Sequence, residues 1–207
     1  DGSGVFLDNT TQNTVKGNSF INTEKLFTYG IYQTGGNINL LESNTAIRNH
    51  AGIELHDTTG NLILSNNLSY NTLGVFMWNS SQNNLTSNTI SNNGAGIEIH
   101  QSTENNLTGN NLTSNVYGFY LDQLTSSNIK TNNFTSNTIG LYSDNANSNQ
   151  IYTNNFSTND TQAYDTGSNN WDNGVNTGNC WSDYSGSGVY EIMGGSNIDH
   201  YPTKTLF

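Results

Sequence analysis

The chain of 207 residues has one cysteine, one proline, few charged residues and no long apolar run. The lone Cys180 excludes an internal disulfide; we interpret it as a small, partly buried residue, with an intermolecular disulfide between stacked copies as the alternative. Only 5 Lys and Arg stand against 16 Asp and Glu, without a basic patch, which argues against binding nucleic acid or an anionic membrane. No run approaches the ~18 apolar residues of a membrane span, so no membrane insertion is expected. The start shows no signal peptide, and we interpret the chain as a processed or excised segment.

What the chain does have is a repeat of 22 residues. A glycine followed by an apolar–variable–apolar triplet recurs at Gly30, Gly52, Gly74, Gly96, Gly118 and Gly140. An earlier copy at Gly4 stands 26 residues before Gly30, so the first coil is expected to carry about four extra residues. A fixed period this short indicates one structural unit stacked on itself.

Written in lines of one repeat, the sequence aligns apolar residues into columns. Alternation within each triplet is the period of a β-strand, and each line holds about three short strands. This pattern predicts an all-β, right-handed, single-stranded parallel β-helix with 22-residue coils, the handedness following that of parallel crossovers. Representative inner positions are Ile53, Leu55, Ile63 and Leu68 in one line and Ile97, Ile99, Leu107 and Leu112 two lines later.

Asparagine fills three further columns, of which Asn66, Asn88 and Asn110 are members of one. We interpret them as architectural, because Asn tolerates the left-handed backbone of a tight corner and its amide can bond to copies above and below. The columns end near residue 165, so the predicted domains are a β-helix of about seven coils over 1–166 and an irregular C-terminal cap over 167–207. Trp171, Trp181 and Tyr184 are the predicted lid, whereas no comparable cap precedes Gly4.

Three motifs in the cap make the chain recognisable: Asn-x-Trp-Asp-x-Gly at 169–174, Gly-Asn-x-Trp-Ser-Asp-Tyr-x-Gly at 178–186 and Gly-Gly-Ser-Asn-Ile-Asp-x-Tyr-Pro at 194–202. Together with the repeat they resemble NosD-type β-helix proteins, which are common among archaeal cell-surface proteins. The resemblance covers the whole chain and implies an exported right-handed β-helix, extracellular or at the cell surface. Cys180 stands where that family usually has Tyr, and its acidic Asp-Gly-Asp-Gly loop is absent, which weakens a calcium site in the cap.

Any functional face is expected on the outward side of the glycine-led strand, where aromatic, carboxylate and imidazole side chains form a stripe. Candidates for a glycan groove are Phe76, Trp78, His100, Tyr120 and Asp122. Glu54 and Glu98 are weak catalytic candidates, because two turns place them roughly 9.6 Å apart, near the upper limit for an inverting glycosidase. Weak metal candidates are the i, i+2 pairs Glu54/His56 and Glu98/His100, each short of the ligands that zinc needs. No cofactor is otherwise expected.

Nine Asn-x-Ser/Thr sequons are candidates for N-glycosylation, which the resemblance to surface glycoproteins makes a reasonable hypothesis. They are Asn9, Asn67, Asn79, Asn84, Asn106, Asn111, Asn133, Asn155 and Asn159.

Three functions remain open from the sequence. The favoured one is a non-catalytic extracellular structural protein, a surface-layer, sheath or filament subunit that self-assembles by coil stacking or joins neighbouring domains of a larger surface protein. The alternative is a carbohydrate-active module that binds a polysaccharide or acts on it as a lyase or hydrolase. A metal-handling periplasmic protein is a third interpretation, which rests on the family name.

Overall fold

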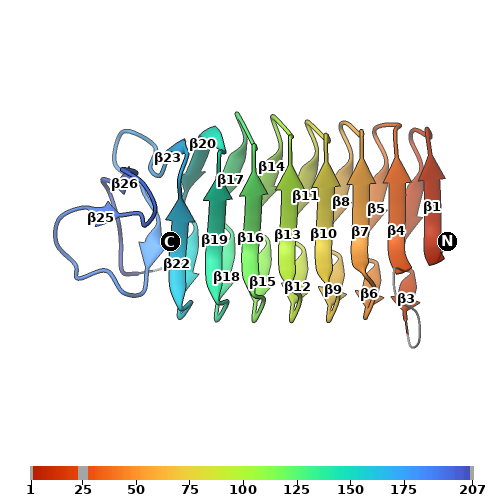
Figure 1. Cartoon of the computed structure of the whole chain (residues 1–207), viewed down its shortest axis with the longest axis horizontal. Coiled ribbons are helices and arrows are strands. Elements are labelled where there is room, and N and C mark those ends of the chain that lie inside the picture. The colour runs from red at the N-terminus through yellow and green to blue at the C-terminus, as the bar shows by residue number, and fades with distance from the viewer. Residues whose placement is uncertain (1, 23–27, 206–207) are drawn as a thin grey trace.

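The computed structural model describes residues 2–22 and 28–205, and every regular element there is a β-strand. The strands form a solenoid of about eight turns, drawn as a rod in Figure 1, with three eight-stranded parallel sheets along its sides. No helix in this part of the chain is long and apolar enough to cross a membrane. The first sheet contains β1 (Gly2–Asp8), β4 (Thr28–Thr34), β7 (Ala51–His56), β10 (Leu73–Trp78), β13 (Ala95–His100), β16 (Tyr117–Asp122), β19 (Ile139–Asp144) and β22 (Thr161–Asp165).

The other two sheets are built from shorter strands. The second contains β2 (Thr14–Lys16), β5 (Leu40–Glu42), β8 (Leu62–Leu64), β11 (Asn84–Thr86), β14 (Asn106–Thr108), β17 (Asn128–Lys130), β20 (Asn147–Tyr152) and β23 (Ser168–Asn170). The third contains β3 (Ser19–Ile21), β6 (Thr45–Ile47), β9 (Asn67–Ser69), β12 (Thr89–Ser91), β15 (Asn111–Thr113), β18 (Asn133–Thr135), β21 (Asn155–Ser157) and β24 (Cys180–Trp181).

The strand register confirms the 22-residue coil. Val75 pairs with Ile53 on one side and Ile97 on the other, and the same offset holds between the inner turns of all three sheets. The offset changes in the last turn of the second and third sheets, where Gln150 pairs with Asn170 and Asn155 with Cys180. In the first turn Val5 pairs with Ile31, an offset of 26 residues. The extra residues fall between Ile21 and Thr28, and 23–27 lie outside the described residues. The predicted boundary at 166 falls inside the last turn, because β23 and β24 still pair with β20 and β21.

The interior is the predicted stack of aliphatic and aromatic side chains. Ile97 and Leu107, from different sides of one turn, are both 0% exposed. The repeated glycine is required by close approach: a Cβ on Gly52 would lie 2.7 Å from the carbonyl oxygen of Gly74 and 3.0 Å from Leu68. A side chain there would therefore separate two turns.

The asparagine columns form continuous hydrogen-bond ladders. Asn88, 1% exposed, accepts at Oδ1 from the backbone N–H and from Nδ2 of Asn66, at 2.9 and 3.0 Å. Its Nδ2 donates to the Ile63 carbonyl and to Asn110 Oδ1, both at 2.9 Å. The expectation that these asparagines adopt the left-handed conformation was wrong, because the preceding residues carry it: Ser43, Ser65 and Ser87 have φ of 55°, 54° and 57°.

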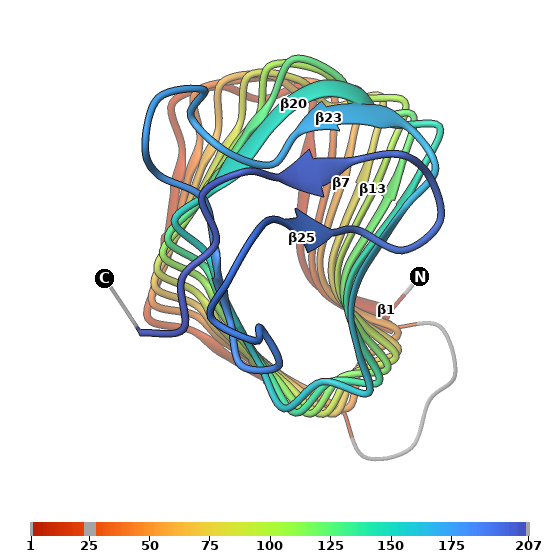
Figure 2. The ribbon, with the colours of Figure 1, turned by 90° about the vertical axis from the view of Figure 1, so that its left-hand side faces the viewer.

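The cap continues the core instead of merely covering it. Trp181, 0% exposed, stacks on Phe156 at 4.4 Å and on Tyr190 at 4.1 Å, and its Nε1 donates to Asp199 Oδ2 at 2.8 Å. Trp171 is buried beside it, and Tyr184 is partly buried against the core, so the predicted lid is confirmed. The antiparallel pair β25 (Tyr190–Glu191) and β26 (Ile198–Asp199) closes the end, where Figure 2 shows β25 lying across the last turn.

Cys180 is the small buried residue that the sequence favours, and the alternative of an intermolecular disulfide does not fit this structure. Cys180 lies on β24 and is only 3% exposed, and its burial raises the pKa of the thiol. A bridge to another chain would require the cap to open.

Replacing Asn88 with alanine should lower the free energy of unfolding by about 2–4 kcal/mol, because it leaves buried backbone groups without partners. Asn84→Ala, an exposed asparagine on neighbouring β11, is the matched control and should change stability by less than about 0.5 kcal/mol. Urea denaturation followed by circular dichroism measures both. Equal effects of the two substitutions would contradict the ladder as a source of stability.

Candidate functional site

Rings and carboxylates gather on the outward face of the first sheet, as predicted. Successive ring centroids lie 5.2–5.8 Å apart from the first turn to the eighth. We call this set the ring row; it consists of Phe6, Tyr32, His56, Phe76, His100, Tyr120, Tyr142 and Tyr164.

The ring row stacks on itself at its two ends, whereas the rings around His56, Phe76 and His100 are tilted by 42–46° to their neighbours. Tyr120 and Tyr142 are inclined by 14°, and Tyr142 and Tyr164 by 4°, so these rings cover one another's faces. They present edges and hydroxyls to solvent, which excludes a broad platform for sugar stacking there. Trp78 differs: it is 39% exposed and stands beside the ring row, inclined by 32° to the His100 ring at 5.5 Å. Its ring is therefore a stacking surface between the strands of the middle turns, and Phe6, 57% exposed on the first turn, is another.

Two strands on either side of Trp78 carry the same motif. Ala51–His56 and Ala95–His100 both read Ala-Gly-Ile-Glu-x-His, and we call them the Glu–His modules. In each, the His Nε2 lies 2.8 Å from Oε1 of the Glu two residues earlier. The alanines align with Tyr29, Leu73 and Tyr117 of other strands, so each module has a small residue where its neighbours have a large one.

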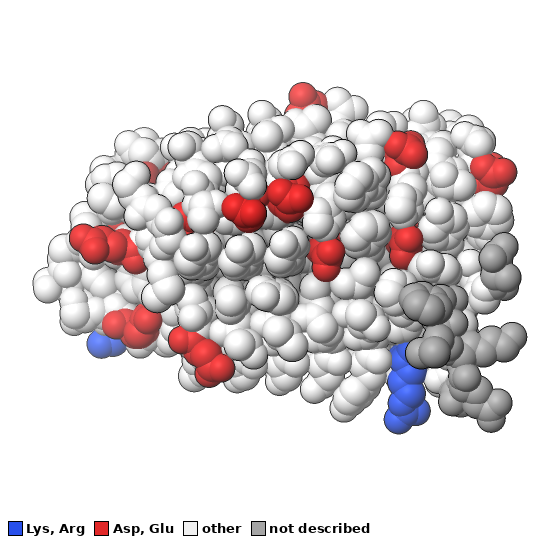
Figure 3. Space-filling model, in the orientation of Figure 1, with Lys and Arg blue, Asp and Glu red and all other residues white. Residues whose placement is uncertain are grey.

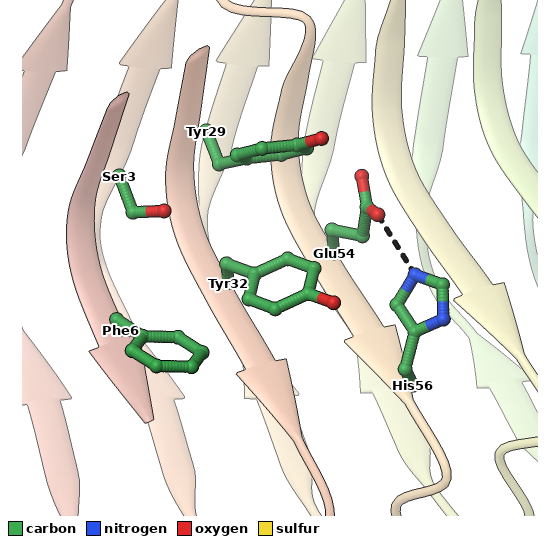
Figure 4. Close-up of a pocket in the computed structure, with 6 residues that line it drawn as sticks. All are labelled: Ser3, Phe6, Tyr29, Tyr32, Glu54 and His56. Carbon is green, nitrogen blue, oxygen red and sulfur yellow. Dashed lines mark hydrogen bonds and ion pairs between the residues drawn. The ribbon is translucent and has the colours of Figure 1, made fainter. Parts of the chain in front are cut away.

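A hollow of about 480 Å³ opens beside the first module, lined by Ser3, Phe6, Tyr29, Tyr32, Glu54 and His56 (Figure 4). Burial raises the pKa of both tyrosines, and the Glu54 carboxylate adds to the rise, so their hydroxyls remain protonated. Glu54 is itself only 8% exposed. The hollow thus combines hydroxyl donors with a carboxylate acceptor, a set suited to a polyhydroxylated ligand. Sequence reasoning missed Tyr29 and Ser3, which the column spacing could have placed beside Glu54.

The second module holds its imidazole between two carboxylates. His100 Nε2 bonds to Glu98 at 2.8 Å, and Nδ1 lies 3.1 Å from Asp122 Oδ2. The hydrogen bond to Glu98 raises the pKa of His100 most, burial opposes the rise, and Asp122 adds to it. Two carboxylate partners favour the protonated ring, and both nitrogens of His100 are engaged, which leaves neither nitrogen free for a metal.

The positions of the candidate residues support neither the catalytic hypothesis nor the metal hypothesis. Phe76 pairs in register between Glu54 and Glu98, and each glutamate is bonded to its own histidine. The glutamates are equivalent members of two modules instead of an acid and a base facing one substrate. Among residues 2–22 and 28–205, no three His, Cys, Asp or Glu side chains are grouped so as to hold a metal.

Most sequon asparagines are exposed or partly exposed; Asn159 is the exception. It is 8% exposed, and its Nδ2, which would carry a glycan, donates to the Phe134 carbonyl and to Gln162 Oε1. Glycosylation of Asn159 does not fit the folded chain. On the third sheet, Asn133 and Asn155 also use Nδ2, each donating to the sequon asparagine one turn earlier.

The His100 resonances should titrate above the ordinary histidine pKa of about 6.5, and Asp122→Asn should lower that pKa. Because the folded-state pKa is raised, this contribution to stability is complete below pH ~6.5 and is lost as pH rises through the folded-state value. NMR titration of the imidazole protons measures the pKa, and thermal denaturation across the same pH range measures the stability. A His100 pKa at or below the ordinary value would refute the two-carboxylate arrangement.

Comparison with solved structures gives several β-helical neighbours. A mutant of the periplasmic alginate epimerase AlgG aligns with a TM-score of 0.67 and 18% identity, over 81% of this chain and 46% of that one. The A-module of the Azotobacter vinelandii mannuronan C-5 epimerase AlgE6 aligns with a TM-score of 0.68 and 17% identity, over 81% and 52%. XylC in complex with xylose aligns with a TM-score of 0.51 and 12% identity, over 94% and 38%. These likenesses show the fold alone, and this chain spans about half the length of the two epimerase chains.

No curated protein matches the chain. A family model described as periplasmic copper-binding protein (NosD) matches residues 1–129 and 117–186, which together are well over half of the sequence. The repeat and the cap motifs that resemble this family lie largely within the matched segments. The chain therefore belongs to the NosD family of parallel β-helix proteins.

Proposed function

We propose that this chain is a non-catalytic carbohydrate-binding module of an exported protein and that it holds a neutral polysaccharide against its first sheet. The observation that carries the proposal is the exposed ring of Trp78, with the Glu54–His56 pair on one side and the Glu98–His100 pair on the other. An aromatic surface beside hydrogen-bonding carboxylates is what a sugar needs, since its ring has an apolar face and a hydroxyl edge.

The charge of this face favours a neutral glycan. Figure 3, which views the first sheet from outside, shows Asp and Glu spread over the face and Lys and Arg only at its lower edge. The described basic residues Lys16, Arg48, Lys130 and Lys204 all lie outside the strands of the first sheet. An acidic polysaccharide would meet carboxylates with no Lys or Arg on these strands, and the His100 ring is already engaged by Glu98 and Asp122, so such a ligand would be repelled.

The similar solved structures support a polysaccharide as the ligand of this chain, but not the particular polysaccharides for which those proteins are named. The two epimerases are named for alginate and mannuronan. Their shared fold makes a polysaccharide a reasonable ligand for this chain, whereas its acidic face argues against a uronate polymer. The self-bonded Glu–His modules argue against transfer of the epimerase chemistry.

Copper, which the family description names, does not fit the described residues. His100 has both nitrogens bonded to carboxylates, His56 is bonded to Glu54, and Cys180 is buried. Soft thiolate or grouped imidazole ligands are what a copper site needs. We therefore derive no function through copper.

A structural subunit that polymerises by coil stacking has less support. The stack of Phe156, Trp181 and the partly buried Tyr190 fills the C-terminal end, so that end offers no open turn to a second copy. The burial of Cys180 removes the cross-link that the sequence suggested. Rods in negative-stain images of concentrated protein would restore this candidate.

Titration with a panel of neutral soluble polysaccharides should change the tryptophan fluorescence, because Trp78 is the exposed tryptophan whereas Trp171 and Trp181 are buried. Trp78→Ala should abolish that change and weaken binding by at least roughly tenfold in calorimetry, given that stacked aromatic contacts dominate such sites. Tyr70→Ala, which removes another exposed aromatic that is 60% exposed and off the first sheet, is the control and should bind normally. Absence of binding to every neutral glycan, or full binding by Trp78→Ala, would refute the proposal.

A further inference from the structure

We infer that the two Glu–His modules recognise alternate sugars of one extended, neutral β-1,4-linked glycan that lies parallel to the solenoid axis. The inference rests on the proposed function and adds the linkage class, the direction of the ligand and the shortest length that fills the site.

The outward face alternates over the three turns of β7, β10 and β13. Ala51–His56 and Ala95–His100 differ at one position, Leu55 against Ile99, which points into the core. The strand between them, Leu73–Trp78, carries Phe76 in place of the glutamate and Trp78 in place of the histidine. Along the axis a ligand therefore meets an acidic turn, an aromatic turn and a second acidic turn of the same composition. No other pair of first-sheet strands in the described chain repeats an outward Glu and His in this way.

The spacing of the modules corresponds to two sugars. Two turns of a parallel solenoid advance ~9.6 Å, which matches the length of a disaccharide in an extended β-1,4-linked chain. Successive sugars of such a chain are turned over relative to one another, so the same hydroxyl edge faces the same side at every second sugar. Sugars n and n+2 would then face Glu54 and Glu98, and sugar n+1 would present its apolar face to Trp78.

Each glutamate retains an acceptor for a sugar hydroxyl. Oε1 of Glu54 and of Glu98 is bonded to its own histidine at 2.8 Å. No protein donor in the described chain bonds to the second oxygen of either carboxylate. The histidine thus orients the carboxylate, and the remaining oxygen can accept a charge-assisted hydrogen bond from the ligand.

Calorimetry with cello-oligosaccharides from the disaccharide to the hexasaccharide tests the inference, with the xylan-derived series as a second β-1,4 probe. The trisaccharide should bind roughly tenfold or more tightly than the disaccharide, because only the longer ligand reaches both modules. Glu54→Gln and Glu98→Gln should each remove this gain. Asp144→Asn, on β19 outside the modules, should leave it unchanged, and thermal melts check that every variant is folded.

The outcomes separate the inference from the proposed function. If neutral glycans bind but the trisaccharide shows no gain, or only one of the two glutamate variants loses it, the two-module recognition is wrong and the binding function stands. Binding of maltotriose in preference to β-1,4-linked trisaccharides would also overturn the inference, since an α-linked chain curves away from the axis. If no neutral glycan binds, the proposed function fails and the inference fails with it.

Discussion

The hydrogen bonding of each turn to the turns above and below is the constraint on which the structure depends. Every inward column must be filled by a side chain that stacks on its own copy, and every corner must satisfy buried amides. Asn88 shows how closely the two requirements are linked, since one side chain bonds to a backbone N–H, a carbonyl and two neighbouring amides. Regularity in this chain follows from the need to leave no buried polar group unpaired.

The same constraint explains why so much of the fold could be read from the sequence. A period of 22 residues identifies inward and outward positions directly, and the burial of Ile97 and Leu107 follows from their columns. Details that depend on torsion angles could not be read in this way. The left-handed backbone falls on Ser65 and Ser87, one residue before the asparagines, because the ladder amide must point inward while the preceding residue turns the corner. Burial of Cys180 depends on the irregular cap, which has no period to align.

The candidate site was predictable as a list of residues but not as an arrangement. Column spacing brings Glu54, Trp78 and Glu98 onto one face, as observed. It does not reveal that Tyr120, Tyr142 and Tyr164 stack on one another and so hide their faces, because that depends on side-chain rotamers. Nor does it reveal that His100 bonds to both Glu98 and Asp122. The strand register places these three residues near one another but does not determine their hydrogen bonds. The structure therefore reduces the candidate residues on the outward face of the first sheet to Trp78 and the two Glu–His modules.

The separation of the two modules by one intervening turn has an evolutionary consequence. Solenoid genes lengthen by duplicating whole coils, and such an event leaves the ladders intact wherever it occurs. Between Ala51–His56 and Ala95–His100, however, it matters whether an odd or an even number of coils is inserted. For the twofold ribbon that we propose as the ligand, one added coil would put the second acidic strand opposite the wrong side, whereas an even number of added coils would restore the match and lengthen the site by whole disaccharides.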